Sequence, residues 1–540
     1  MNLITTPVLI VGGGPVGLSL SLDLSWRNIP HILVERDGRA ARSGHPRMDQ
    51  VGVRSMEHFR RLGIVADIEA AGFPRDRRRD VVFATGVLGY ELAREPFEAD
   101  ATRAPPPFSP QKHELCPQNF LDPALQAAAG RSACADIRYN TRLTALLERD
   151  GTVECVTVDA AGAERMVVAR YLAGCDGSSG SVATQLGITA QGSTMLACST
   201  NIFINCPTLR HRAAGPGAYR YLLVGPSSIW ASMVNIDGCN VWRLQVLGDA
   251  QRPNWTPEEA RRVVDRAIGA EAEYELAGIV PWARRELIMD RFATRRCFLV
   301  GDAAHQFSPT GGYGMNTGIA EAFDLSWKLA ATIDGWGGPG LLASYETERR
   351  PIAIRNAQRA TINFERMRAL RNNPGIETPG PEGDATRRQA GAEIRASLAE
   401  EWDSMGIHLG YSYAGSPIIC DDPVPGTHAD PAHYIQTASP GARAPHAWIT
   451  PDGSTLDLFG HGFVLLCTGD PADAAPLAAE AHQQGMPLRV EVVTDREIAR
   501  LYERGLVLVR PDGHVAMRCN TLPHDVAGLV ARLRGARSPC

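Results

Sequence analysis

The N-terminal segment alternates apolar runs with turn residues in the order strand, helix, strand. Residues 6–11 (TPVLIV) form an apolar run that is typical of a buried strand. A glycine-rich turn follows, and then an apolar stretch to about Leu24 that predicts a helix. The next apolar run, His31–Arg36 (HILVER), predicts a second strand. This order is the β-α-β pattern of a dinucleotide-binding fold.

Helix and strand patterns continue through the first third of the chain. Residues 54–63 predict a helix closed by a glycine, whereas residues 73–110 are rich in Arg and Pro and predict irregular structure. Strand-like segments then follow at 137–149, 153–160 and 167–177. We assign all of these segments to the first domain.

The pattern changes after about residue 187. Alternating apolar and polar positions between 187 and 286 (YRYLLVG, IWASMV, NVWRLQVLG) predict an antiparallel sheet in a second domain that lies over the first. Dinucleotide-type sequence returns at 295–305 (RRCFLVGDAAH), so the first domain is expected to be discontinuous. A long helix is predicted over 344–371, and the Pro- and Gly-rich residues 372–392 predict a loop or linker.

Length and composition agree with several domains in one chain. The protein has 540 residues, more than one hydrophobic core of about 250–300 residues holds. The formal net charge of −5 argues against nucleic acid or an anionic membrane as the main partner. We find no apolar run of the roughly 18–20 residues that a membrane span needs, and no basic segment typical of a signal peptide. We therefore expect a cytoplasmic location.

The twelve cysteines are scattered from Cys116 to Cys540 and form no CxxC motif. A metal site or a disulfide framework needs tighter clustering, so we expect neither. If the protein uses dioxygen, an organic cofactor must therefore activate it.

The first motif with chemical meaning is Gly12–Gly17 (GGGPVG), which fits GxGxxG between a strand and a helix. Glycines at these positions allow the tight turn and let a pyrophosphate approach the backbone at the helix N-terminus. Glu35 ends the second strand about twenty residues later, where a carboxylate accepts hydrogen bonds from a ribose. Together these features predict dinucleotide binding.

A second segment narrows the choice of dinucleotide. The strand FLVGD delivers Asp302 at its end, and Pro309 and the turn Gly311–Asn316 lead into an apolar helix. A carboxylate at a strand end can bind a ribityl hydroxyl. Backbone amides at the start of the helix can face a flavin pyrimidine and stabilise negative charge on it.

In these motifs the chain resembles the class A flavoprotein aromatic hydroxylases, in the branch of phenol hydroxylase and dichlorophenol hydroxylase. The family combines GxGxxG, a DG motif, a GD motif and a C-terminal thioredoxin-like domain. They match Gly12–Gly17, Asp176-Gly177, Gly301-Asp302 and the strand-rich unit after Gly441. The resemblance implies FAD bound without a covalent link, reduction by NADPH or NADH, and hydroxylation of a phenolic ring with dioxygen through a flavin hydroperoxide.

The resemblance also implies an α/β fold with three domains. A discontinuous Rossmann-like FAD-binding domain is expected over residues 1–186 and, together with long helices, over 287–400. A substrate domain built on a mixed or antiparallel sheet is expected over 187–286. A linker and the thioredoxin-like domain are expected over 401–540. A homodimer is possible for this family.

The cofactor residues follow position by position from the family motifs. The expected FAD contacts are Gly12, Gly14, Pro15, Val16, Gly17, Glu35, Arg36, Arg47, Gln118, Leu143, Asp176, Asp302, Pro309, Gly314, Met315 and Asn316. Arg47 resembles the family arginine that contacts the mobile flavin, Arg54 is a further candidate, and Leu143 is expected to contact the adenine through its backbone. The family usually has an Arg shortly after the DG motif, where this chain has Ser181–Ala183. With no second GxGxxG, a transient nicotinamide site on the flavin cleft is expected.

The substrate residues follow from what a phenol hydroxylation needs. A carboxylate, Tyr or His must accept a hydrogen bond from the phenol so that its ring can attack oxygen. Asp49 resembles the Asp that phenol hydroxylase uses in this loop, and Tyr221, in the strand YRYLLVG, is a second candidate for this role, with Arg47 as a catalytic cation. Asp49, Tyr221, Pro309 and Tyr313 are expected to contact the substrate, and His305 is a further candidate for the pocket wall.

Two other readings stay open at this point. A Baeyer–Villiger oxygenase or an epoxidase acting on a polyketide-type substrate would use the same scaffold. A flavin-binding protein without catalysis is the alternative from a different class. The WxWxIP motif of the flavin halogenases is absent from the sequence.

Overall fold

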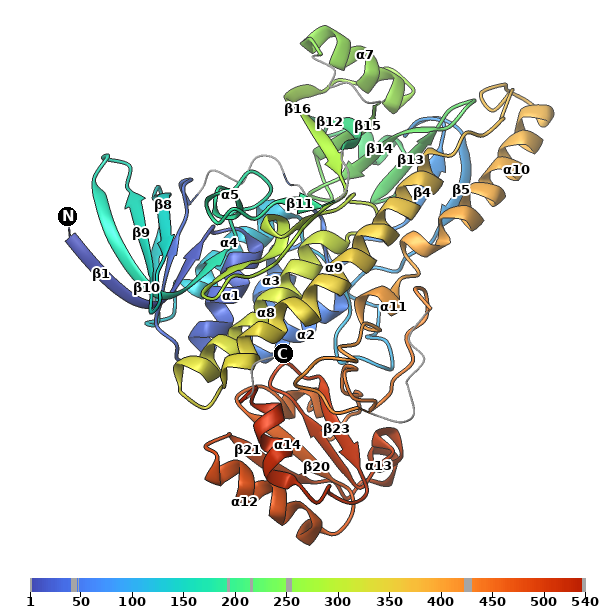
Figure 1. Ribbon diagram of the computed structural model, residues 1–540. Helices are drawn as coiled ribbons and strands as arrows, with labels where there is room; N and C mark the ends of the chain where they lie inside the picture. The colour runs from blue at the N-terminus through green and yellow to red at the C-terminus, as the bar shows by residue number, and fades with distance from the viewer. Residues whose placement is uncertain are drawn as a thin grey trace.

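The computed structural model describes residues 2–39, 46, 48–191, 195–213, 217–248, 255–421 and 430–536. It is a mixed α/β structure of three parts (Figure 1). The first sheet and its helices form the centre and left of the view, a second sheet lies at the upper right, and the C-terminal part lies below.

The first sheet is the nucleotide-binding type that the N-terminal pattern predicts. Its strand order is β7-β2-β1-β10-β9-β8, and β18 also pairs with β10. Strands β7, β2, β1, β10 and β18 run parallel, while β9 and β8 form an antiparallel extension. The bounds are β1 (Asn2–Val11), β2 (His31–Val34), β7 (Ala135–Arg138), β8 (Arg142–Glu148), β9 (Val153–Val158), β10 (Glu164–Gly174) and β18 (Cys297–Leu299). Because β18 comes from residues far along the chain, this sheet combines strands from two separate parts of the sequence.

Apolar helices pack against this sheet. Helix α1 (Pro15–Trp26) follows β1 directly and contacts α8 (Tyr313–Ile333), which follows β18. Both helices bury almost all of their residues in the largest hydrophobic core of the molecule. The two segments with flavin-type motifs are therefore the starts of two neighbouring helices.

The second sheet has the order β16-β12-β15-β14-β13-β4-β5. Its bounds are β4 (Val81–Ala84), β5 (Glu91–Glu95), β12 (Met195–Asn205), β13 (Arg220–Val224), β14 (Ile229–Asn235), β15 (Val241–Leu247) and β16 (Glu275–Arg285). The central strands are antiparallel, as the alternating pattern predicts. Strands β4 and β5 come from residues 73–110, which the sequence predicts to be irregular and part of the first domain. Val81–Ala84 is a fully buried run of four residues, too short to stand out among the flanking Arg and Pro residues.

The two faces of this sheet differ in character. On the outer face, Tyr221, Trp242 and Leu244 form an apolar core with helix α7 (Pro257–Ile268), which lies at the top of Figure 1. Side chains alternate along a strand, so the residues between them lie on the inner face, toward the first domain. The cross-strand pairs Arg220–Val234 and Val234–Arg243 align two arginines on that inner face.

Two long helices connect the parts. Helix α9 (Pro339–Arg368) begins five residues before the predicted range of 344–371 and ends three residues before its end. Helix α10 (Pro381–Leu398) begins inside the stretch predicted as a loop or linker. Its first turn contains Pro381, Glu382 and Asp384, which are residues that favour a helix N-terminus. The composition that was interpreted as a linker therefore belongs to the start of a helix.

The C-terminal part holds a four-stranded sheet in the order β21-β20-β22-β23. The strands are β20 (Phe463–Cys467), β21 (Leu488–Val492), β22 (Leu506–Val509) and β23 (Val515–Cys519), with helices α12 (Ala475–Gln483), α13 (Arg496–Tyr502) and α14 (Val526–Leu533). All four strands lie after Gly441, in the part of the chain that was expected to be rich in strands. Cys467 is buried, and its Sγ lies near the Asp470 carbonyl oxygen.

Buried charges join this part to the flavin-type helices. Arg510, in the turn between β22 and β23, donates to Glu348 of α9 at 2.6 Å and to Asp324 of α8 at 3.2 Å. Arg443 donates to Glu57 of α2 (Val53–Arg61) at 2.5 Å. Replacing one partner of such a pair leaves a buried charge without compensation, so these contacts hold the parts in one arrangement.

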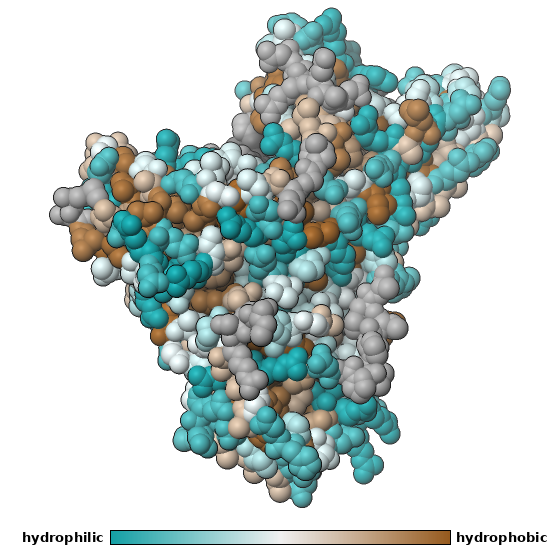
Figure 2. Space-filling view, viewed as in Figure 1, coloured by the Kyte–Doolittle hydropathy of each residue, from teal (hydrophilic) through white to brown (hydrophobic). Residues whose placement is uncertain are grey.

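The visible surface is mostly hydrophilic, with hydrophobic residues gathered around the arm that holds β1 and β8 (Figure 2). Within the described ranges, no helix is long and apolar enough to cross a membrane. The same residues contain no group of three His, Cys, Asp or Glu side chains placed to hold a metal ion.

The stability of the protein is expected to fall between pH 6.5 and 4 because of His514. This side chain is buried beside Tyr411 and Tyr413, and burial lowers its pKa to about 4. In the unfolded chain this histidine has a pKa of about 6.5, so below that pH it binds a proton that the folded chain does not bind. The free energy of unfolding therefore decreases as the pH falls, by up to about 3 kcal/mol from this residue. Urea unfolding midpoints measured from pH 7 to 4.5 should show a flatter profile for H514F than for the wild type. The exposed His524 provides the control, and identical slopes for H514F and H524F would contradict the assignment.

Candidate active site

The turn after β1 is built by backbone contacts that admit only glycine. Gly12 has a φ of +112°, and a Cβ there would lie 2.2 Å from the Cys175 carbonyl oxygen at the end of β10. A Cβ on Gly17 would lie 2.0 Å from the carbonyl oxygen of Gly12. Gly14 is the N-cap of α1. Because it has no side chain, no side-chain hydrogen bond caps the backbone amides in the first turn of the helix. This geometry suits a phosphate at the helix N-terminus.

Glu35 braces the same turn. Its carboxylate is buried and accepts hydrogen bonds from the Gly13 amide at 2.6 Å and the Asp37 amide at 2.9 Å. A carboxylate at the end of the second strand is where a dinucleotide-binding fold binds a ribose hydroxyl. The exposed Arg36 donates to Ser179 across the mouth of the turn at 3.4 Å.

Asp176, of the DG motif, orders the loop beside the glycine turn. Its Oδ2 accepts from the amides of Ser181 and Val182 at 2.6 and 3.0 Å. The side chain is largely buried, and this desolvation raises its pKa. In the described structure Asp176 therefore shapes the loop that packs against Gly12.

The second flavin-type segment touches the first. Gly301 has a φ of +64°, and a Cβ on it would lie 3.1 Å from a methyl group of Val16 in α1. A Cβ on Gly318 of α8 would in turn lie 2.8 Å from the Cα of Gly301. Asp302 and Pro309 are both exposed. The close approach brings both motifs to one place, as a single extended cofactor requires.

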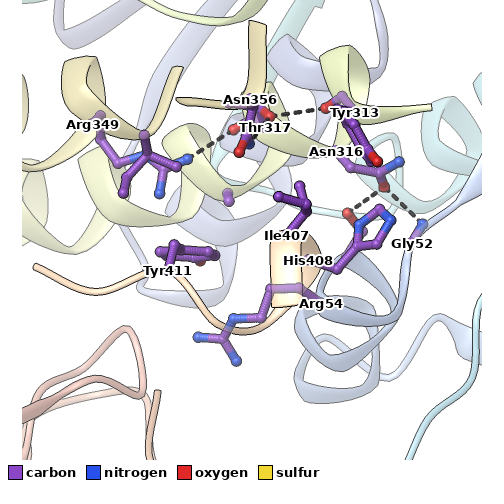
Figure 3. A pocket seen from close by; sticks show the side chains of 13 residues that line it. Gly52, Arg54, Tyr313, Asn316, Thr317, Arg349, Asn356, Ile407, His408 and Tyr411 are labelled. Carbon is purple, nitrogen blue, oxygen red and sulfur yellow. Dashed lines mark hydrogen bonds between the residues drawn. The ribbon is translucent and has the colours of Figure 1, made fainter. Parts of the chain in front are cut away.

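Asn316 links the start of α8 to the chain around Asp49. Its Oδ1 accepts from the Gly52 amide at 2.7 Å and from the Ser55 hydroxyl at 2.8 Å. Its Nδ2 donates to the carbonyl oxygens of Gly312 at 2.8 Å and Gln50 at 3.3 Å. One amide side chain thus holds two loops of the site together (Figure 3).

A small polar pocket lies behind this link, between α2, α8, α9 and α11 (Met405–His408) (Figure 3). Its walls are Gly52, Arg54, Ser55, Tyr313, Asn316, Thr317, Ala320, Arg349, Ile352, Asn356, Ile407, His408 and Tyr411. Burial lowers the pKa of His408 to about 4, so this ring is neutral at physiological pH.

Asp49 lies at the junction of the first domain and the inner face of the second sheet. Arg243 of β15 donates to both of its carboxylate oxygens, at 3.0 and 2.5 Å, and also to the Pro46 carbonyl oxygen. The Tyr219 hydroxyl forms a hydrogen bond with the same carboxylate. Burial and the negative charge of Asp49 raise the pKa of Tyr219 well above its usual value, so this phenol stays protonated. Asp49, Arg243 and Tyr219 form what we call the Asp49 cluster.

Three residues expected near the substrate are buried in contacts with other protein groups. Tyr221 packs against Trp242 on the outer face of the sheet, since strand alternation directs it away from Asp49. Tyr313 is buried, and its hydroxyl accepts a hydrogen bond from Asn363 of α9. His305 is fully buried and paired with Glu321 at 2.8 Å, which holds the turn around Gly301.

Other candidates have structural partners. Arg54 donates to Glu57 and to the Asp512 carbonyl oxygen, so it faces the C-terminal part. The backbone N–H of Gln118 donates to the Met48 carbonyl oxygen. This bond places the start of α4 (Gln118–Ala129) beside the Asp49 loop. Leu143 buries its side chain in the core. Arg47 lies outside the described residues.

Tyr219, Arg243 and Arg284 were not predicted from the sequence. Arg243 lies inside β15, Arg284 lies near the end of β16, and Tyr219 directly precedes β13. These segments were interpreted only for their alternation of apolar and polar positions. The sequence pattern that could have identified Arg243 and Arg284 as site residues is an arginine at a position of an alternating strand that faces inward.

Comparison with known proteins agrees with this geometry. A family described as FAD binding domain matches residues 5–360, and one described as aromatic-ring hydroxylase, C-terminal, matches residues 437–536. The 4-methyl-5-nitrocatechol 5-monooxygenase of a Burkholderia species is 31% identical, over 97% of this chain and 95% of its own. The 2,4-dichlorophenol 6-monooxygenase of Cupriavidus pinatubonensis is 29% identical, over 98% of this chain and 96% of its own.

A solved structure extends the likeness to three dimensions. RebC, soaked with chromopyrrolic acid and containing bound 7-carboxy-K252c, is 40% identical with a TM-score of 0.93. The match covers 99% of this chain and 100% of RebC. The resemblance inferred from the motifs is thereby confirmed, and the chain belongs to the FAD-binding aromatic-ring hydroxylases, a family of flavoprotein monooxygenases.

Proposed function

We propose that this monooxygenase hydroxylates a phenolic ring bound between the Asp49 cluster and the turn that contains Pro309. The observation that carries the proposal is the cluster itself, an oriented carboxylate with a protonated tyrosine at the junction of the two domains. A phenol hydroxyl can donate a hydrogen bond to the Asp49 carboxylate there. A ketone offers only an acceptor, so the cluster favours phenol hydroxylation over a Baeyer–Villiger reaction.

The residues present fit FAD. The glycine turn and the first-turn amides of α1 suit its pyrophosphate, Glu35 its ribose, and the exposed Asp302 its ribityl chain. The start of α8, with Gly314, Met315 and Asn316, directs backbone amides toward the pyrimidine ring. When bound and reduced, FAD supplies the activation of dioxygen.

The protein's own groups then have distinct roles. Asp49 accepts the hydrogen bond of the substrate hydroxyl and increases electron density on the ring. Arg243 holds the carboxylate in one orientation through two bonds, and Tyr219 donates to it. Closure of the second sheet over the first domain excludes water from the reacting ring.

We further infer NADPH or NADH as the reductant, acting at a transient site on the flavin cleft. The absence of a second GxGxxG in the sequence supports this arrangement. We also infer a Rossmann-like topology for the first domain, a thioredoxin-like C-terminal domain and a homodimer. The parallel strand order around β1 and the mixed sheet β21-β20-β22-β23 support the two domain assignments.

The purified holoenzyme tests the proposal directly. We expect slow NADPH or NADH oxidation alone, and at least tenfold faster oxidation with a phenol that fits, together with a product heavier by one oxygen atom. Mass spectrometry and oxygen consumption over a panel of mono- and polycyclic phenols measure both. A panel that neither accelerates oxidation nor gives a hydroxylated product would exclude phenol hydroxylation.

Replacing Asp49 by Ala or Asn is expected to lower kcat for hydroxylation by about 10²- to 10⁴-fold while FAD stays bound. Y219F should reduce it less, because it removes one of the two groups that orient the carboxylate. Y221F is the matched control, since this tyrosine packs against Trp242 in the core under α7. Equal turnover for D49A and the wild type would remove Asp49 from the mechanism.

Replacing Gly12 by Ala is expected to abolish FAD retention. The new Cβ would collide with the Cys175 carbonyl oxygen in a backbone conformation that L side chains rarely adopt. The molar ratio of FAD to purified protein, read from the flavin absorbance, should fall at least tenfold. Gly151 has open space around its Cα, so G151A should keep the wild-type ratio. Full FAD content in G12A would show that this turn does not hold the cofactor.

A further inference from the structure

Arg284 is a buried arginine whose hydrogen bonds all go to neutral groups. It lies near the end of β16 and is 1% exposed. Its Nε donates to the Ser199 hydroxyl at 3.0 Å, its Nη1 to the Ser308 hydroxyl at 3.2 Å, and its Nη2 to the Gln245 Oε1 at 3.0 Å. The rings of Trp282 and Phe364 lie 4.8 and 4.6 Å from its guanidinium carbon.

The charge of Arg284 has no paired counterion. Over the described ranges no carboxylate lies within ion-pair distance of it, although the other inner-face arginines have one each: Arg220 with Glu401, and Arg243 with Asp49. Burial, and then the positive charge of Arg220, lower the pKa of Arg284 to about 9, so it stays protonated at neutral pH. An unpaired buried cation is costly, and a protein that keeps one has a use for the positive potential.

The position of Arg284 indicates that use. Gln245, one of its partners, lies two residues from Arg243 on β15, and both side chains point to the inner face. Ser308, another partner, directly precedes Pro309. Arg284 therefore joins the face that holds the Asp49 cluster to the turn expected beside the flavin.

We propose that Arg284 is a positioning residue that favours the ionised form of the bound phenol through its positive charge and holds the Ser308–Thr310 turn in place. The inference rests on the proposed function and adds a group to it. The phenol O–H bond breaks and an O–H bond forms on Asp49, either directly or through the hydroxyl of Tyr219. The negative charge left on the substrate oxygen then lies in the field of Arg284.

The other charged groups around Arg284 are few. Arg220 and Glu401 face it from β13 and from the segment after α10, and their charges offset each other at 2.6 Å. Arg368, at the end of α9, adds positive charge. Asp49 and Arg243 form the remaining pair on this face. Removing Arg284 therefore removes the charge on this face that has no paired counterion.

The test uses the FAD-loaded enzyme and 4-nitrophenol, whose phenolate absorbs strongly. We expect wild-type enzyme to bind it with a pKa below the value free in solution. R284M should raise the pKa of the bound phenol by about one to two units, as expected for loss of a unit charge several ångströms away at an effective dielectric constant of about 20. R284K should restore most of the shift. R266M is the matched control, because Arg266 stacks on Trp230, which belongs to the same sheet, and should behave as wild type.

A second variant protects the test against misfolding of R284M. S199D places a carboxylate beside the Nε of Arg284, compensates its charge and should raise the pKa of the bound phenol in the same direction. The acid limb of the kcat profile should move with the pKa in each variant. Equal values in wild type, R284M and S199D would overturn the proposal. So would a lowered flavin reduction potential in R284M with an unchanged phenol titration, because the charge would then serve the reduced flavin. If wild-type enzyme hydroxylates no phenol, the proposed function itself fails, which is a separate outcome.

Discussion

The close approach of backbones at Gly12, Gly301 and Gly318 is the constraint on which the rest of this structure depends. At Gly12 the end of β1 lies against the end of β10, and at Gly301 the end of β18 lies against α1 and α8. A side chain at any of these points would separate the elements that meet there. The glycines therefore allow the two segments with flavin-type motifs to approach closely enough to form one continuous site.

Buried charges then fix the other parts around that site. Lys328 of α8 donates to Asp324 and Glu348, and Arg510 reaches the same two carboxylates from the C-terminal part. These pairs cost desolvation energy and yield little net stability compared with apolar packing, but each tolerates only one geometry. Helix α8 begins at the cofactor segment and ends among these charges. The C-terminal part is thus coupled through these charges to the orientation of α8.

How much of this was predictable depends on the range of the interactions. The GxGxxG turn, the strand that delivers Asp302 and the alternating strands of the second sheet have local signatures, and the structure contains all of them. Val81–Ala84 joins the second sheet through a parallel pairing with β13, a contact between segments over a hundred residues apart that no local pattern records. Helix α10 was hidden because Pro and acidic residues mark both linkers and helix starts.

The candidate site shows the same limit more sharply. Asp49 could be selected from the loop that carries it, but its partners come from the second sheet, where a shift of one position moves a side chain to the opposite face. Tyr221 was selected as an aromatic residue in the right segment, and Tyr219, two residues earlier and before the strand begins, is the one that meets Asp49.

Polar side chains on the inner face of the second sheet are the features that distinguish a site from a core. The outer face buries Tyr221, Trp242 and Leu244 under α7, in the manner of an ordinary sheet–helix interface. The inner face instead buries arginines, which a protein interior accepts only with partners. Two of them have carboxylates, and the partners of Arg284 are neutral. Under the proposed function, the positive charge of Arg284 lies on the same face as a carboxylate and a protonated tyrosine, and this arrangement favours loss of the phenol proton.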